Sequence, residues 1–119
     1  MLEGSFYTLH NPQPADQAFT AEVRFNAAHE IFEGHFPGQP VVPGVCMMQL
    51  IKEQFNKLVQ QPYTLREGQQ IKFLAMIDPV QTPSVQLTLG WQPAGEGYWV
   101  TAVLQQDATI FLKYKARFA

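Results

Sequence analysis

One histidine stands where proton-transfer chemistry is plausible. His35 follows Gly34 and opens a segment rich in proline and glycine that runs to Gly44. Imidazole exchanges a proton near neutral pH, and the prolines restrict the backbone of the loop that holds it. His35 is therefore a candidate general base. The alternative is a histidine that packs in the loop without catalysing anything.

The same loop leads into a predicted helix. Pro43 suits the first position of a helix, and residues 44–60 have the length and pattern of an ordinary one. The free N–H groups at its start, near Gly44 and Val45, can polarise a carbonyl oxygen. A base beside a polarised carbonyl is what proton abstraction next to a thioester requires.

Two polar residues of this helix are further candidates. Residues 45–51 are apolar except Gln49, so we expect this half to be buried on all sides. Glu53 lies one turn further on nearly the same face. Either side chain could meet a substrate, but Gln49 could equally be a satisfied core amide and Glu53 a solvated carboxylate. We expect the second half of the helix to keep one apolar stripe, with its polar residues outside it: Lys52, Glu53, Gln54, Asn56 and Lys57.

Other reactive residues have weaker support. Cys46 has apolar neighbours and reads as a small buried residue rather than a nucleophile, because no nearby residue offers a base. Met47 and Met48 suit the core, or the lining of a tunnel for an acyl chain. The spacing of histidine, cysteine and acidic residues fits no metal site, and we expect no cofactor.

Alternating apolar residues predict an antiparallel sheet around the helix. A short strand at 5–10 and a turn at Asn11–Asp16 begin the chain, and a single helical turn is expected within 27–33. Further strands are predicted at 18–26, 69–77, 84–91, 98–105 and 109–118. Their short connectors imply antiparallel neighbours. We expect one α+β domain over 1–119, with a curved sheet of five to six strands wrapped around the helix and a dimer that covers its exposed edges.

Composition excludes several classes of partner. The chain has 119 residues, 46% of them hydrophobic and 15% charged, which fits a folded globular protein. The net charge of -2 gives no basic footprint for nucleic acid or anionic lipid. Three cations on one strand face, Lys113, Lys115 and Arg117, read as a solvated surface that could also attract an acidic carrier protein. A single cysteine and the lack of an evident signal peptide or membrane span predict the cytoplasm.

The segment Glu33–Val45, EGHFPGQPVVPGV, resembles the active-site signature of the bacterial β-hydroxyacyl-acyl-carrier-protein dehydratases. Ile71–Leu74 resembles the strand that follows their helix. The resemblance implies a hot-dog fold, a dimer with active sites at the interface, and an acyl chain in a tunnel. It also implies that His35 abstracts the proton or positions water and that the Gly44 N–H holds the thioester carbonyl. The residues expected to contact substrate are Phe36, Pro43, Gly44, Val45 and Met48.

The chain departs from this family at the position of its acid. In these enzymes an acidic residue on the helix, contributed across the dimer, protonates the leaving hydroxyl, and that position falls on Gln49. An amide cannot act as a general acid at neutral pH. The family commonly has Glu and then Gln four residues on, whereas this chain has Gln49 and then Glu53. One hypothesis is that Glu53 takes the acid role.

Three functions remain open on these residues. The first is a dehydratase-like protein that converts 3-hydroxyacyl thioesters of acyl carrier protein or coenzyme A into trans-2-enoyl thioesters, in lipid or polyene synthesis. The second is a hot-dog acyl thioesterase. The third is a non-catalytic acyl-binding chain, or the partner subunit of an active dehydratase-like chain that supplies the acid.

Overall fold

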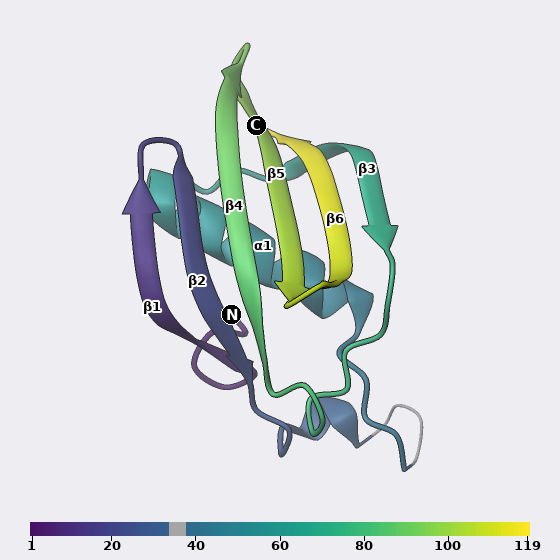
Figure 1. Cartoon of the computed structure of the whole chain (residues 1–119). Helices are drawn as coiled ribbons and strands as arrows, with labels where there is room; N and C mark the ends of the chain where they lie inside the picture. The colour runs from purple at the N-terminus through teal and green to yellow at the C-terminus, as the bar shows by residue number, and fades with distance from the viewer. Residues whose placement is uncertain (34–37) are drawn as a thin grey trace.

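The computed structural model describes residues 1–33 and 38–119, and it contains one long helix and one sheet (Figure 1). A 3-10 turn, η1 (Glu30–Phe32), precedes the helix α1 (Gly44–Val59). No helix in this part of the chain is long and apolar enough to cross a membrane. The six strands are β1 (Tyr7–Ala15), β2 (Ala18–Phe25), β3 (Leu65–Phe73), β4 (Ser84–Ala94), β5 (Gly97–Gln106) and β6 (Thr109–Phe118).

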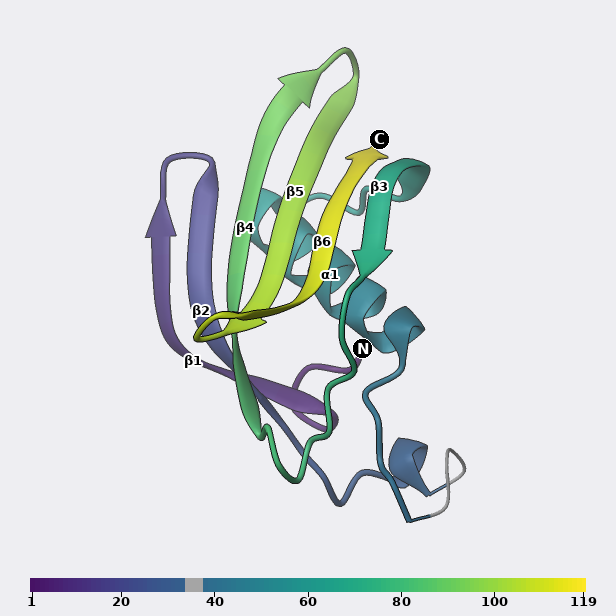
Figure 2. The ribbon, with the colours of Figure 1, turned by 45° about the vertical axis from the view of Figure 1, so that its right-hand side comes forward.

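The position of β3 determines the path of the helix. The strand order is β1-β2-β4-β5-β6-β3, and every neighbouring pair is antiparallel. The chain leaves the sheet after β2, near one edge, and returns as β3 at the opposite edge. Because α1 lies between them in sequence, it crosses behind the sheet, as the two views show (Figure 1, Figure 2). The predicted α+β arrangement of one helix against a curved antiparallel sheet of five to six strands is confirmed.

The core lies between α1 and the concave face of the sheet. Leu50, Ile51 and Phe55 of the helix are fully buried. They face alternate residues of the four central strands, because successive side chains of a strand point to opposite faces of the sheet. The strand residues in this layer include Val23, Leu87, Leu89, Val100, Leu104, Leu112, Ala116 and Phe118.

The first strand differs from its prediction. The expected turn at Asn11–Asp16 is wrong, because β1 continues to Ala15 and the chain turns only after it, at Gln17 with φ 54°. β1 is an edge strand, where a proline that lacks an N–H need not break a ladder hydrogen bond. The irregularity falls instead in the register between His10 and Gln13, where Asn11 has φ 52°.

The strand after the helix is also displaced from its prediction. We predicted 69–77 with one apolar face, but β3 ends at Phe73, and nearly all of its residues are exposed. The chain then leaves the sheet edge to reach β4. Ile77 is buried outside the strand, where its carbonyl oxygen accepts the N–H of Val42 at 2.9 Å. The alternating apolar pattern of residues 69–77 therefore covers the end of β3 and part of the loop that follows it.

Burial around α1 reverses part of the expected pattern. Its first half is not buried on all sides, because Val45 is 75% exposed and Met48 and Gln49 are half-buried. In the second half, Glu53 and Gln54 were expected outside the apolar stripe but are buried. The reason is the N-terminal segment, which folds back onto this face of the helix and hydrogen-bonds both side chains.

Candidate functional site

The loop that carries the candidate base is anchored on both sides. His35 and Phe36 themselves lie outside the described residues. Before them, the ring of Phe32 stacks on Phe6 with centroids 5.2 Å apart, and Nδ1 of His29 accepts the N–H of Ile31 at the start of η1. After them, Gly38 has φ 84°, a conformation that favours glycine. The flank before the loop is therefore held by aromatic packing and a hydrogen bond, and the flank after it by the hydrogen bond from the Val42 N–H to the Ile77 carbonyl oxygen.

The start of α1 has the properties needed to bind a carbonyl oxygen. Pro43 is the N-cap residue; no side chain caps the helix, and its carbonyl oxygen accepts the N–H groups of Cys46 and Met47. Within the described part of the chain, no acceptor takes the N–H of Gly44. The Phe73 ring packs on Gly44 so closely that a Cβ there would lie 2.9 Å from Cζ of the ring. A side chain at position 44 would therefore require the half-exposed Phe73 ring to move aside.

A shallow groove of about 200 Å³ runs along α1 beside this terminus. Three of the predicted site residues line it together: Val45, Met48 and Gln49. Strand residues complete it, and most of its lining is apolar. The other lining residues are Lys52, Leu65, Tyr114 and Phe118. The groove suits an apolar chain with a few polar contacts.

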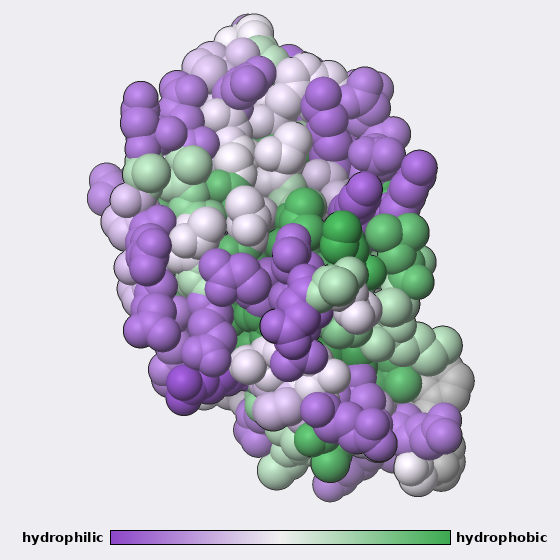
Figure 3. Space-filling model, in the orientation of Figure 1, coloured by the Kyte–Doolittle hydropathy of each residue, from purple (hydrophilic) through white to green (hydrophobic). Residues whose placement is uncertain are grey.

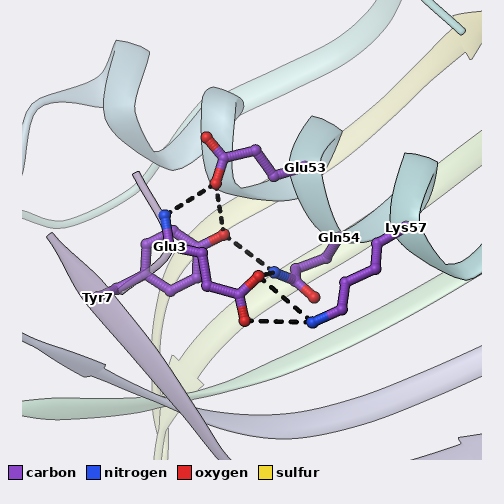
Figure 4. Close-up of polar contacts among 5 residues, drawn as sticks. All are labelled: Glu3, Tyr7, Glu53, Gln54 and Lys57. Atoms are coloured by element: carbon purple, nitrogen blue, oxygen red, sulfur yellow. Dashed lines mark hydrogen bonds and ion pairs between the residues drawn. The ribbon is translucent and has the colours of Figure 1, made fainter. Parts of the chain in front are cut away.

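Glu53 lies one turn beyond Gln49, and both oxygens of its carboxylate accept hydrogen bonds. Figure 4 shows the contacts with Tyr7 and Glu3. Its Oε2 accepts the Leu2 N–H at 2.7 Å and Nε2 of Gln49 at 3.0 Å. Its Oε1 accepts the Tyr7 hydroxyl at 2.9 Å and the Glu3 N–H at 3.0 Å. Two backbone and two side-chain donors thus converge on one carboxylate.

These contacts favour the ionised form of Glu53. Burial favours the neutral acid, but the hydrogen bonds from Leu2, Gln49, Tyr7 and Glu3 outweigh it and lower the pKa of Glu53 below its ordinary value of 4.5. A general acid must hold a proton at the working pH. The geometry therefore supports an ionised carboxylate at neutral pH rather than the acid role of our hypothesis.

The network extends to further groups behind Glu53 (Figure 4). Nε2 of Gln54 donates to the Tyr7 hydroxyl at 3.0 Å and to Oε1 of Glu3 at 2.9 Å. Lys57 forms an ion pair with Glu3 at 3.4 Å on the exposed side. Burial and the nearby carboxylates raise the pKa of Tyr7, so its hydroxyl keeps its proton and donates.

Sequence reasoning missed three residues of this region. Tyr7 and Tyr114 are buried in the core, and Phe73 lies half-exposed at the end of β3. Burial raises the pKa of Tyr114 to about 12, so the groove is lined by a neutral phenol. The Ile71–Leu74 resemblance was the signal that could have linked Phe73 to the site. The sequence contained no such signal for Tyr7 and Tyr114, because their contacts join distant parts of the chain.

The other candidate chemistries gain no support from the described residues. Cys46 is buried, and burial raises the pKa of its thiol, which disfavours a thiolate nucleophile. Among residues 1–33 and 38–119, no three histidine, cysteine or acidic residues lie close enough together to hold a metal ion.

Comparison with known proteins points to dehydratases. The sequence model of the family described as "ApeI-like: ApeI dehydratase" matches residues 11–111. The 3-hydroxyacyl-[acyl-carrier-protein] dehydratase FabZ of Thermus thermophilus is 40% identical over 57 residues, which are 47% of this chain and 37% of that protein. FabZ of Legionella pneumophila is 35% identical over 71 residues, 55% of this chain and 47% of that protein. The chain thus matches less than half the length of these relatives.

Two solved structures share the fold. A chain of the dehydratase heterocomplex ApeI:P from Xenorhabdus doucetiae has a TM-score of 0.77 at 19% identity, covering 95% of this chain and 97% of its own length. An uncharacterized protein from Erwinia carotovora subsp. atroseptica has a TM-score of 0.68 at 21% identity, covering 96% and 94%. The predicted hot-dog fold is confirmed by these likenesses.

The Glu53 network makes stability depend on pH. Glu53→Gln removes the charge that four donors bind, so we expect the free energy of unfolding at pH 7 to fall by about 1–3 kcal/mol. Because the folded pKa of Glu53 is lowered, the parent keeps this stabilisation above about pH 4.5 and loses it as the pH falls through the folded pKa. The free energy of unfolding of Glu53→Gln should therefore decrease less with falling pH than that of the parent. Urea denaturation between pH 7 and pH 3 measures both.

The matched control is Glu22→Gln. The Arg24 guanidinium lowers the pKa of Glu22, but on the surface, so this change should cost less at pH 7. If Glu53→Gln matched the parent at every pH, the carboxylate would not be the anchor that its contacts indicate.

Proposed function

The chain belongs to the ApeI-like dehydratase family, and from that membership we propose that it is a dehydratase-like protein acting on 3-hydroxyacyl thioesters. The reaction is reversible loss of water to give a trans-2-enoyl thioester. The thiol bearer is an acyl carrier protein or coenzyme A. The pathway is lipid or polyene synthesis.

The observation that carries this proposal is the uncapped start of α1 beside the groove. The Gly44 N–H has no acceptor among the described residues, and Val45, Met48 and Gln49 continue from it along an apolar surface. A thioester carbonyl bound at Gly44 would place its acyl chain along that surface. His35 lies nine residues before Gly44 in the sequence and acts in this proposal as the base or positions water.

A second function is favoured by the state of the two polar residues on α1. Gln49 is an amide, and Glu53 is ionised by its four donors, so neither offers a proton at neutral pH. A partner chain with its own acid would complete the site. The similar chain from Xenorhabdus doucetiae belongs to a dehydratase heterocomplex, which supports this interpretation. In it, the present chain is a binding or supporting subunit.

The first test replaces the proposed base. In an assay of 3-hydroxyacyl thioester dehydration, with carrier-protein and coenzyme A substrates in parallel, His35→Ala should lower the rate about 10²–10⁴-fold, because general-base catalysis is lost. His10→Ala, on the edge strand β1, is the matched control and should keep the parent rate. An equal rate for His35→Ala would remove His35 from the mechanism. Release of free thiol without dehydration would instead favour the thioesterase.

The second test restores the missing acid. Gln49→Glu places a carboxyl group one turn from the ionised Glu53, and the nearby negative charge should raise its pKa toward that of a working acid. We expect dehydration by the purified chain to rise about 10²-fold or more. A parent chain that gains activity only when mixed with a dehydratase-like partner would show the second function. If Gln49→Glu does not raise the dehydration rate and a dehydratase-like partner does not raise it either, both proposed functions are contradicted.

The exposed edge of the sheet supports a dimer. β3 pairs on one side only, and the surface around its end is apolar (Figure 3). The other edge strand, β1, carries Pro12 and Pro14, which cannot donate to a new ladder. We therefore propose that a second hot-dog chain, normally another copy, covers β3 and the open side of the groove. The large exposed apolar residues on this side are Val45, Leu65, Phe73, Leu74 and Met76.

A double substitution tests this contact. Leu74→Lys with Met76→Lys adds two charges to side chains that are 53% and 74% exposed, so folding should tolerate it while association suffers. Size-exclusion chromatography with light scattering should show a dimer for the parent and a monomer for the variant. Gln86→Lys, on the outer face of β4, should leave the dimer intact. A monomeric parent would refute the proposed assembly.

A further inference from the structure

The side chain that caps η1 is an imidazole, whose charge changes with pH. Nδ1 of His29 accepts the Ile31 N–H at 3.0 Å. A backbone N–H can only donate, so Nδ1 must carry no proton and the ring proton must lie on Nε2. The cap therefore requires the neutral form of His29. Asparagine and serine, two of the usual capping residues, cap a helix without this condition.

The turn that His29 caps is also held by the N-terminal segment. The rings of His29 and Phe6 meet edge to face with centroids 5.4 Å apart, and Phe6 in turn stacks on Phe32. Phe6 is fully buried, and its carbonyl oxygen accepts the Asn26 N–H. The His29 backbone completes the turn, because its N–H donates to Asn26 and its carbonyl oxygen accepts the Phe32 N–H. One residue thus links the cap to the aromatic stack.

Protonation of His29 would remove the cap. Imidazole takes up a proton between about pH 8 and pH 5. A protonated Nδ1 would direct its own N–H at the N–H of Ile31, and rotation of the ring to avoid this would disturb its contact with Phe6. Loss of a cap of this kind changes an equilibrium by about fivefold.

The charged groups nearby do not hold this imidazole in its charged form. No carboxylate among residues 1–33 and 38–119 forms an ion pair with the His29 ring. The N-terminal segment meets the ring with an apolar side chain, and its own carboxylate, Glu3, pairs with Lys57 of α1. Glu30 and Glu33 belong to the turn itself, and both are exposed.

We propose that His29 is a positioning residue for the proposed dehydration, and that its protonation releases η1 and lowers the rate at acid pH. The inference rests on the proposed function, in which His35, six residues after His29, is the base. His35 must be neutral to accept a proton, and His29 must be neutral to cap the turn that precedes it. The rate should therefore fall more steeply below neutral pH than one titrating base allows.

NMR spectroscopy tests the cap without a substrate. At pH 8 the nitrogen signals of the His29 ring should show the proton on Nε2. As the pH falls to 5.5, the Ile31 amide signal should shift in step with the ring signals, because its acceptor is lost. Glu53, whose pKa is lowered below 4.5, keeps its charge over this range. A proton on Nδ1 at pH 8, or an Ile31 amide that does not follow the ring, overturns the pH-dependent cap.

The pH profile of dehydration tests the positioning role. The assay runs from pH 8 to pH 5.5, with a dehydratase-like partner chain present if the parent requires one. His29→Asn supplies a cap that does not titrate, so the fraction of its pH 8 rate that remains at pH 5.5 should be about fivefold larger than in the parent. His29→Ala has no cap at any pH, so its rate at pH 8 should be about fivefold below that of the parent. A role in packing alone would lower the rates of both variants without changing the shape of the profile.

The matched control is His10→Asn. His10 lies on the edge strand β1, where Nε2 is 3.0 Å from the Thr8 hydroxyl oxygen, and its loss should leave the parent profile. If His29→Asn also keeps the parent profile, the role of His29 is overturned and the proposed function stands. Absence of dehydration from the parent, alone and with a partner, overturns the proposed function and the catalytic role of His29 together. In that case the Ile31 amide alone decides whether the cap responds to pH.

Discussion

The crossing of α1 behind the sheet is the constraint on which the rest of the structure depends. Because β3 joins β6 at the edge opposite β1 and β2, the intervening helix must traverse the whole concave face. One stripe of the helix meets the central strands and forms the core. Another side of its first half, with Val45 and Met48, is left open beside β3. The groove is thus a consequence of connectivity: the helix cannot be covered on both sides by a single layer of sheet.

The carboxylate of Glu53 organises the adjoining side of the same helix. The N-terminal segment precedes β1 there, and it is held both by hydrogen bonds to Glu53 and Gln54 and by the buried ring of Phe6. A polar cluster of this kind is stable only when each member is satisfied. On one side, Glu53 binds the N–H groups of Leu2 and Glu3 and so joins the N-terminal segment to the helix. On the other side, it binds Gln49, which lines the groove. Structural support and the candidate site therefore share one charged group.

The parts of the fold that follow local patterns could be predicted, and those that depend on distant contacts could not. β6 and the start of α1 agree with prediction, because alternation and a proline before a helix are local signals. The extension of β1 through its prolines depends on its place at the sheet edge. The burial of Glu53 and Gln54 depends on a segment about fifty residues away, so their polar character alone suggested solvent. In the candidate site, the sequence placed Gln49 and Glu53 one turn apart but could not reveal the donors that ionise Glu53.

The two prolines of β1 also limit how far copies of this chain can accumulate. A sheet that accepts neighbours at both edges can grow without end, as fibrils do. Here Pro12 and Pro14 make one edge a poor template, whereas the other edge strand, β3, contains no proline. Edge-to-edge growth through the proposed β3 contact would then stop after a single addition, since the joined pair would expose only β1 strands. The same residues that made the first strand hard to recognise thereby disfavour polymerisation through the β1 edge.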